Sequence, residues 1–104
     1  MPGSGVRCGR CGREFGKEEQ VACISAKIMG DECTDVYYWC GECEVYTIRL
    51  CRDVFLGPDT ERTSDPIPKQ EGDRRLMLIR SCPEPGNERC RCDGHRAYFG
   101  GWLD

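Results

Sequence analysis

Cysteine is the residue type that most constrains how this chain can fold. The sequence of 104 residues contains ten cysteines, while 38% of its residues are hydrophobic and 32% are charged. Because a short chain of this composition can build only a thin core, we expect cross-links to supply part of its stability. Cysteines supply such links as disulfides in oxidising compartments or as metal ligands in reducing ones.

The compartment decides between disulfides and metal ligands. The N-terminal stretch MPGSGVRCGRC has no apolar run that would form the core of a signal peptide. No stretch of the chain approaches the length of a transmembrane helix. We therefore expect a cytoplasmic location with no membrane association, in which the cysteines bind metal ions.

The first group of cysteines consists of two Cys-x2-Cys pairs, Cys8 with Cys11 and Cys40 with Cys43. Two residues between cysteines let a tight turn direct both sulfurs at one point, and two such turns complete a tetrahedron around an ion. Four protein ligands leave no open position, which favours a structural zinc ion. A redox or catalytic metal is the alternative.

The two pairs carry a resemblance. The stretch CGRCGREF resembles the metal-binding knuckle of rubredoxins, in which Cys-x-x-Cys-Gly is followed by an aromatic residue, here Phe15. The first half of the chain also resembles the zinc-ribbon fold group. The second knuckle departs from the rubredoxin pattern, since Glu44 follows Cys43 where that pattern has glycine. The resemblance implies an antiparallel ribbon, with iron in the first site as the alternative to zinc.

The second group brings the only histidine of the chain close to three cysteines, as Cys82, Cys90, Cys92 and His95. If the chain is helical from Cys92 onward, Cys92 and His95 lie three residues apart and face the same side. Three cysteines and one histidine are a recognised structural zinc set. The alternative is an exposed histidine beside cysteines that are buried as apolar groups.

If His95 binds a metal ion, it is not available for catalysis. No other histidine remains to act as a general base near neutral pH, and no pair of carboxylates is singled out by its spacing. We therefore expect that the protein is not an enzyme.

The first half of the chain reads as a small antiparallel sheet. Residues 21–29 alternate as a half-buried strand does, residues 30–35 read as a polar turn, and residues 36–40 have the aromatic content of a returning strand. Residues 44–51 form another β-rich segment. These patterns predict three strands.

The second half begins with a polar, proline-rich segment. Residues 57–72 contain three prolines and no aromatic residue, and read as a long loop. Asp73 is expected to cap a short helix over residues 74–81, although the apolar run at residues 76–79 also suits a strand. A final short helix is expected over residues 93–99, ended by two glycines.

The predicted fold is a small α+β metal-stabilised protein. A three-stranded antiparallel zinc-ribbon sheet is followed by one or two short C-terminal helices. The expected parts are a zinc-ribbon-like module at residues 1–56, a loop at 57–72, and a helical zinc module at 73–104 that packs on the ribbon.

Three cysteines fall outside both groups. We interpret Cys23 as a small core residue, and Cys33 and Cys51 as surface thiols. An alternative ligand role, for Cys51 above all, and a disulfide between Cys33 and Cys51 remain open.

Arginines flank both cysteine groups. They are Arg7, Arg10 and Arg13 at the first, and Arg80, Arg89, Arg91 and Arg96 at the second. We interpret them as local compensation of thiolate charge, and binding of nucleic acid as the alternative. The formal net charge of −3 disfavours binding of nucleic acid, because proteins that bind nucleic acid are usually basic.

The C-terminal tail AYFGGWLD is rich in apolar side chains. We expect Tyr98, Phe99 and Trp102 to fold back onto the core. In the alternative, Trp102 and Leu103 form an exposed anchor for a partner protein.

These observations together predict a small protein that holds two structural zinc ions and acts as a protein-interaction or adaptor module. The alternatives are a rubredoxin-like electron-transfer protein with iron in the first site, and a nucleic-acid-binding zinc ribbon.

Overall fold

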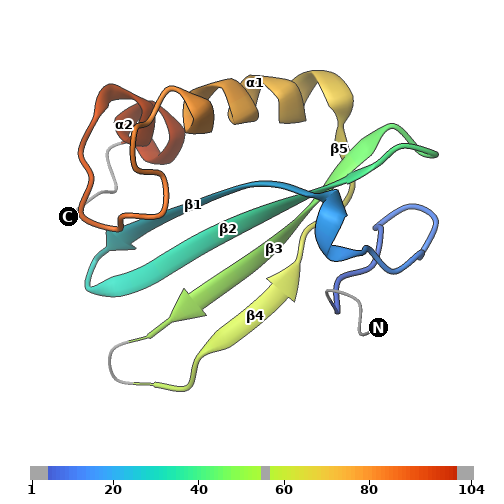
Figure 1. The fold of residues 1–104 in the computed structure, drawn as a ribbon. Coiled ribbons are helices and arrows are strands. Elements are labelled where there is room, and N and C mark those ends of the chain that lie inside the picture. The colour runs from blue at the N-terminus through green and yellow to red at the C-terminus, as the bar shows by residue number, and fades with distance from the viewer. Residues whose placement is uncertain (1–4, 55–56, 101–104) are drawn as a thin grey trace.

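The computed structural model describes residues 5–54 and 57–100, which form one antiparallel sheet and two α-helices (Figure 1). A short 3-10 helix, η1, at Lys17–Glu19 leads into the sheet. The strands are β1 (Gln20–Ile28), β2 (Asp31–Cys40), β3 (Val45–Asp53), β4 (Thr60–Thr63) and β5 (Ile67–Pro68). The helices are α1 (Lys69–Arg80) and α2 (Asp93–Phe99). The small α+β class expected from the sequence is confirmed.

A tight hairpin joins β1 to β2. Ile28 pairs with Asp31, so Met29 and Gly30 are the only two residues of the loop. Their φ angles are 52° and 85°, and two successive positive φ values match the twist of the flanking strands. The expected polar turn at residues 30–35 is therefore wrong, because most of that segment belongs to β2.

The sheet contains five strands among the described residues, which corrects the expected three. The strand order is β1-β2-β3-β4, and β5 also pairs with β3. Both additional strands lie in residues 57–72, where a loop was expected. All four residues of β4 are exposed, so this edge strand lacks the apolar alternation that identifies a half-buried strand.

Helix α1 begins five residues earlier than expected, at Lys69, so Asp73 lies inside the helix and does not cap it. Its carboxylate instead accepts hydrogen bonds from the Tyr46 hydroxyl and the Lys69 ammonium group. The run at residues 76–79 is helical rather than extended, with Leu76 and Ile79 buried. Helix α1 is also not strictly C-terminal. Helix α2 begins and ends where the sequence predicts.

Hydrophobic side chains form a cluster on each face of the sheet. Between the sheet and α1 lie Ile24, Tyr37, Tyr46, Ile48, Leu76 and Ile79. On the opposite face, beneath the N-terminal segment, lie Val6, Cys8, Phe15, Tyr38, Cys40 and Val45. Tyr37 and Tyr38 therefore enter different clusters, as neighbours on a strand must. The core is divided in two, and each half is small.

Helix α1 lies very close to the sheet at Gly72. A Cβ atom at this position would overlap the ring of Tyr46. Glycine is costly inside a helix, so its presence here is explained by this contact.

We expect Gly72→Ala to destabilise the metal-loaded protein by about 1–3 kcal/mol through overpacking. Helix propensity alone would stabilise the variant by about 1 kcal/mol, so the two effects differ in sign. Urea unfolding followed by circular dichroism measures the difference. The control is Gly86→Ala, where nothing lies within 4 Å of the added Cβ. A stabilised Gly72→Ala variant would contradict the described packing.

Candidate metal centres

The four cysteines of the first group converge. The sulfur atoms of Cys8, Cys11, Cys40 and Cys43 all lie within 4.8 Å of one another. The Cys11 and Cys40 sulfurs are 4.0 Å apart. Ligands at about 2.3 Å from a tetrahedral zinc ion lie about 3.8 Å from each other. The group could therefore hold a metal ion with small adjustments.

Each pair of this group lies on a tight turn. In the first turn, the Gly12 amide donates to the Cys8 carbonyl oxygen at 2.9 Å, and Gly12 has a φ of 78°. In the second, the Glu44 amide donates to the Cys40 carbonyl oxygen at 2.8 Å, and Glu44 has a φ of 54°. Glu44 thus adopts the left-handed conformation that glycine favours, and the second knuckle keeps the geometry of the first.

The first turn is anchored on the sheet. The Gly9 amide donates to Thr47 Oγ1 of β3 at 3.1 Å, and Phe15 stacks on Tyr38 of β2 with 5.3 Å between ring centroids. Cys8 and Cys40 are buried, whereas Cys11 is exposed. The second turn joins β2 to β3 directly. The group therefore links the N-terminal segment to one end of the sheet.

The thiols of the first group differ in acidity. Burial raises the pKa of the Cys40 thiol, but hydrogen bonds from the Cys43 amide and the Arg13 guanidinium outweigh burial and lower it to about 7. Burial and the neighbouring thiols raise the pKa of Cys43 to about 12. Cys40 is therefore prepared to bind a cation as a thiolate.

The second group also converges. The ligand atoms of Cys82, Cys90, Cys92 and His95 all lie within 4.8 Å of one another. The Cys82 and Cys90 sulfurs are 3.5 Å apart. His95 Nδ1 lies 3.0 Å from the Cys82 sulfur and 3.7 Å from the Cys92 sulfur. This group could hold a second metal ion.

The tautomer of His95 follows from its second nitrogen. Its Nε2 lies 2.8 Å from the backbone carbonyl oxygen of Ser25, which can only accept, so Nε2 carries the hydrogen. The lone pair is then on Nδ1 and points at the sulfurs, the arrangement in which imidazole binds a metal. The His95 side chain is 0% exposed, so the alternative of an exposed histidine is wrong.

Three segments build the second group. Cys82 comes just after α1, and Cys92 is the N-cap of α2, where its sulfur accepts a hydrogen bond from the His95 amide at 3.4 Å. The intervening loop pairs with the edge of β1, since the Ser25 amide donates to the Pro85 carbonyl oxygen at 2.8 Å. No pattern in the sequence indicates the contact between His95 and Ser25, which are 70 residues apart.

The acidity of the thiols in the second group also varies. A hydrogen bond from the His95 backbone amide is the largest cause that lowers the pKa of Cys92, to about 6. Burial is the main cause that raises the pKa of Cys82 to about 12.

The remaining cysteines stay apart from both groups. All ten cysteines are free, which excludes the alternative disulfide in this structure. Cys33 is buried, which corrects its interpretation as a surface thiol, while Cys23 and Cys51 are half-buried. Among the described residues, the clustered ligands include none of these three. Trp102 and Leu103 lie outside the described residues, so their role stays a prediction.

The fold and its clustered ligands define the class of this protein. It is a small α+β protein with an antiparallel sheet, two helices and two cysteine-rich groups that could hold metal ions. Comparison with known proteins found no matching family model, no matching curated protein and no matching solved structure. None of the helices within residues 5–54 and 57–100 is long and apolar enough to cross a membrane.

The backbone at Glu44 generates a stability prediction. A left-handed conformation costs a residue other than glycine about 1–2 kcal/mol, so a substitution by glycine removes this cost. Glycine has more conformational entropy in the unfolded state, which offsets about 0.5–1 kcal/mol of the stabilisation. Glu44→Gly should therefore stabilise the metal-loaded protein by about 0.5–1 kcal/mol. Chemical denaturation measures the change.

The matched control is Glu42→Gly in the same turn. Glu42 is not among the residues with positive φ, so this variant should gain nothing. Equal effects of the two substitutions would show that the left-handed backbone at Glu44 carries no cost.

Proposed function

We propose that this chain is a small structural-zinc protein that presents a rigid surface to another protein. One observation carries the proposal: each group offers four convergent ligands. In the first group they come from two turns that are far apart along the chain, and in the second from the ends of two helices and the loop between them. Zinc bound by four protein ligands cross-links such segments and has no open coordination position. The ions would then supply stability that the small, divided hydrophobic core does not provide.

The second group supports zinc as the metal. Three cysteines with one histidine form a recognised structural zinc set, and the tautomer of His95 suits it. We assign the same metal to the first group. Iron in the first group is a second candidate, because Glu44 preserves the knuckle turn and the Arg10 amide donates to the Cys8 sulfur at 3.4 Å.

We infer that the protein is not an enzyme. Both nitrogens of His95 are engaged, one with the cysteine sulfurs and one with the Ser25 carbonyl, so the imidazole has no site left for proton transfer. Four protein ligands around each ion leave no position for a substrate or a reactive water.

A protein is a better partner than nucleic acid. The net charge is −3, and several arginines near the cysteines are engaged within the fold. Arg13 pairs with Glu19, Arg7 donates to the Gly12 carbonyl, and Arg91 donates to the carbonyls of Glu88 and Cys90. These contacts support a local role for the arginines.

Protein purified under reducing conditions should contain two zinc ions per chain and show no visible absorption. His95→Ala should lower the content to one ion, while Cys23→Ser, outside both groups, should keep two. Structural zinc contributes about 10–16 kcal/mol per site, more than most domains have in total stability, so a chelator should unfold the chain. Elemental analysis and circular dichroism test this. One ion in the unmodified protein, or visible absorption, contradicts the assignment.

Cross-linking in cells followed by mass spectrometry should link the chain to another protein. The links should survive nuclease treatment, and the purified protein should elute from heparin at low salt. The control is a double variant, Cys40→Ser with His95→Ala, which should lose both metal ions and the partner. Nuclease-sensitive capture would favour nucleic acid instead and contradict the proposal.

A further inference from the structure

The helix-facing side of the sheet carries a groove that neither metal group uses. It consists of two adjoining hollows of about 450 and 380 Å³ that share Ile28, Asp35 and Phe99. The larger hollow extends over β3 and β4, where Leu50, Arg52 and Arg62 line it. The smaller one extends beneath the helices. Volumes of this size are typical of small-molecule sites.

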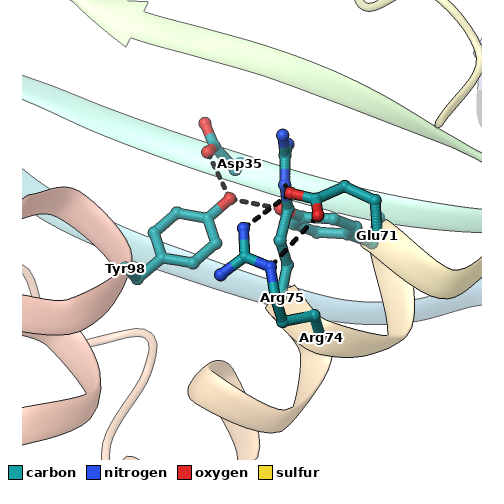
Figure 2. Close-up of polar contacts among 6 residues, drawn as sticks. Asp35, Glu71, Arg74, Arg75 and Tyr98 are labelled. Atoms are coloured by element: carbon teal, nitrogen blue, oxygen red, sulfur yellow. Dashed lines mark hydrogen bonds and ion pairs between the residues drawn. The ribbon is translucent and has the colours of Figure 1, made fainter.

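A chain of hydrogen bonds fixes the inner end of the groove (Figure 2). The Tyr98 hydroxyl of α2 donates to Asp35 Oδ2 of β2 at 2.7 Å, so the Tyr37 hydroxyl donates to Tyr98 in turn. Glu71 holds Arg75 beside these groups. Burial raises the pKa of Asp35. The other carboxylate oxygen, Oδ1, has no hydrogen-bond donor among the described residues.

Two arginines stand at the outer end of the groove. Arg62 pairs with Leu50 across β3 and β4, and Arg52 pairs with Thr60. The two guanidinium groups therefore lie on one face of the sheet as diagonal neighbours. The Arg62 side chain forms no ion pair or hydrogen bond within the described part of the chain, and Arg52 is 4.0 Å from Asp31. Guanidinium pairs of this kind bind carboxylate or phosphate groups.

The strand register aligns the inner and outer ends of the groove in one row of paired residues. Asp35 pairs with Leu50, and Leu50 pairs with Arg62, so the three residues form a row across β2, β3 and β4. Adjacent strands are about 4.8 Å apart, so the ends of the row are about 10 Å apart at the backbone. After both side chains reach inward, a single ring or short chain fits between them. Leu50 forms the floor, and Phe99 lies beside it.

We propose that this groove binds a small organic anion. Arg52 and Arg62 bind its carboxylate or phosphate group, and its apolar body lies on Leu50. A hydroxyl or amine at its opposite end donates to Asp35 Oδ1. The site uses none of the metal-ligating side chains and goes beyond the proposed structural role.

Titration of the isotopically labelled, metal-loaded protein with three probes, followed by NMR, tests the site. The probes are 4-hydroxybenzoate, benzoate and acetate. Amide shifts should saturate around Leu50 and Arg62. 4-Hydroxybenzoate should bind about two- to tenfold tighter than benzoate through one added hydrogen bond, and acetate should bind weakest. Equal affinity for the three probes, or shifts elsewhere, would overturn the proposal.

Variants separate the two ends of the site. Arg62→Gln, at an exposed position, should weaken both aromatic probes several-fold without unfolding the protein. Asp35→Asn should reduce the advantage of 4-hydroxybenzoate over benzoate. The control Arg80→Gln removes the same charge from an exposed helical site outside the groove and should change neither affinity. Unchanged binding by Arg62→Gln would overturn the site even if the metal assignment holds.

Discussion

Four potential ligand atoms converge in each cysteine group, and this convergence constrains much of the surrounding backbone. In the first group, it requires two tight turns, and Glu44 takes a left-handed conformation to form the second. In the second, it brings the ends of α1 and α2 together beside β1, where the Ser25 carbonyl orients His95. The two hydrophobic clusters lie between these groups, on opposite faces of the sheet. Each half of the core is thus bordered by a group that could hold a metal ion.

The sequence predicted what depends on local spacing. Two residues between cysteines define a turn by themselves, and the separation of Cys92 and His95 fixes their common face once α2 forms. Contacts between residues that are far apart along the chain could not be predicted from the sequence. Nothing in the sequence marks Ser25 as the hydrogen-bond partner of His95, because a backbone carbonyl is present at every position. The exposed strand β4 was also missed, since an edge strand with no buried face has no apolar alternation.

The groove on the helix-facing side exists because the chain has few hydrophobic residues with which to cover the sheet. Helix α1 packs against β1, β3 and β5, while α2 is only seven residues long. Figure 1 shows β4 at the edge of the sheet that is distant from the helices. No helix covers this part of the sheet within the described residues, so polar and charged side chains line the groove beside Leu50 and Phe99. The half-buried Asp35 is stabilised there because Tyr98 donates to it.

An anion site in a protein of net charge −3 needs a reason why the overall charge does not repel its ligand. Screening of distant charges supplies it, and it also covers any thiolate charge of the cysteine groups. The second cysteine group lies beyond β1, at least three strand spacings from Arg62, which is about 14 Å. The first lies at the Val45 end of β3, seven residues from Arg52, which is about 23 Å along a strand. Physiological salt screens exposed charges beyond about 8 Å. A ligand in the groove therefore experiences mainly the charges close to it, which are the two guanidinium groups, Asp31 beside Arg52 and the Asp35 carboxylate at its far end.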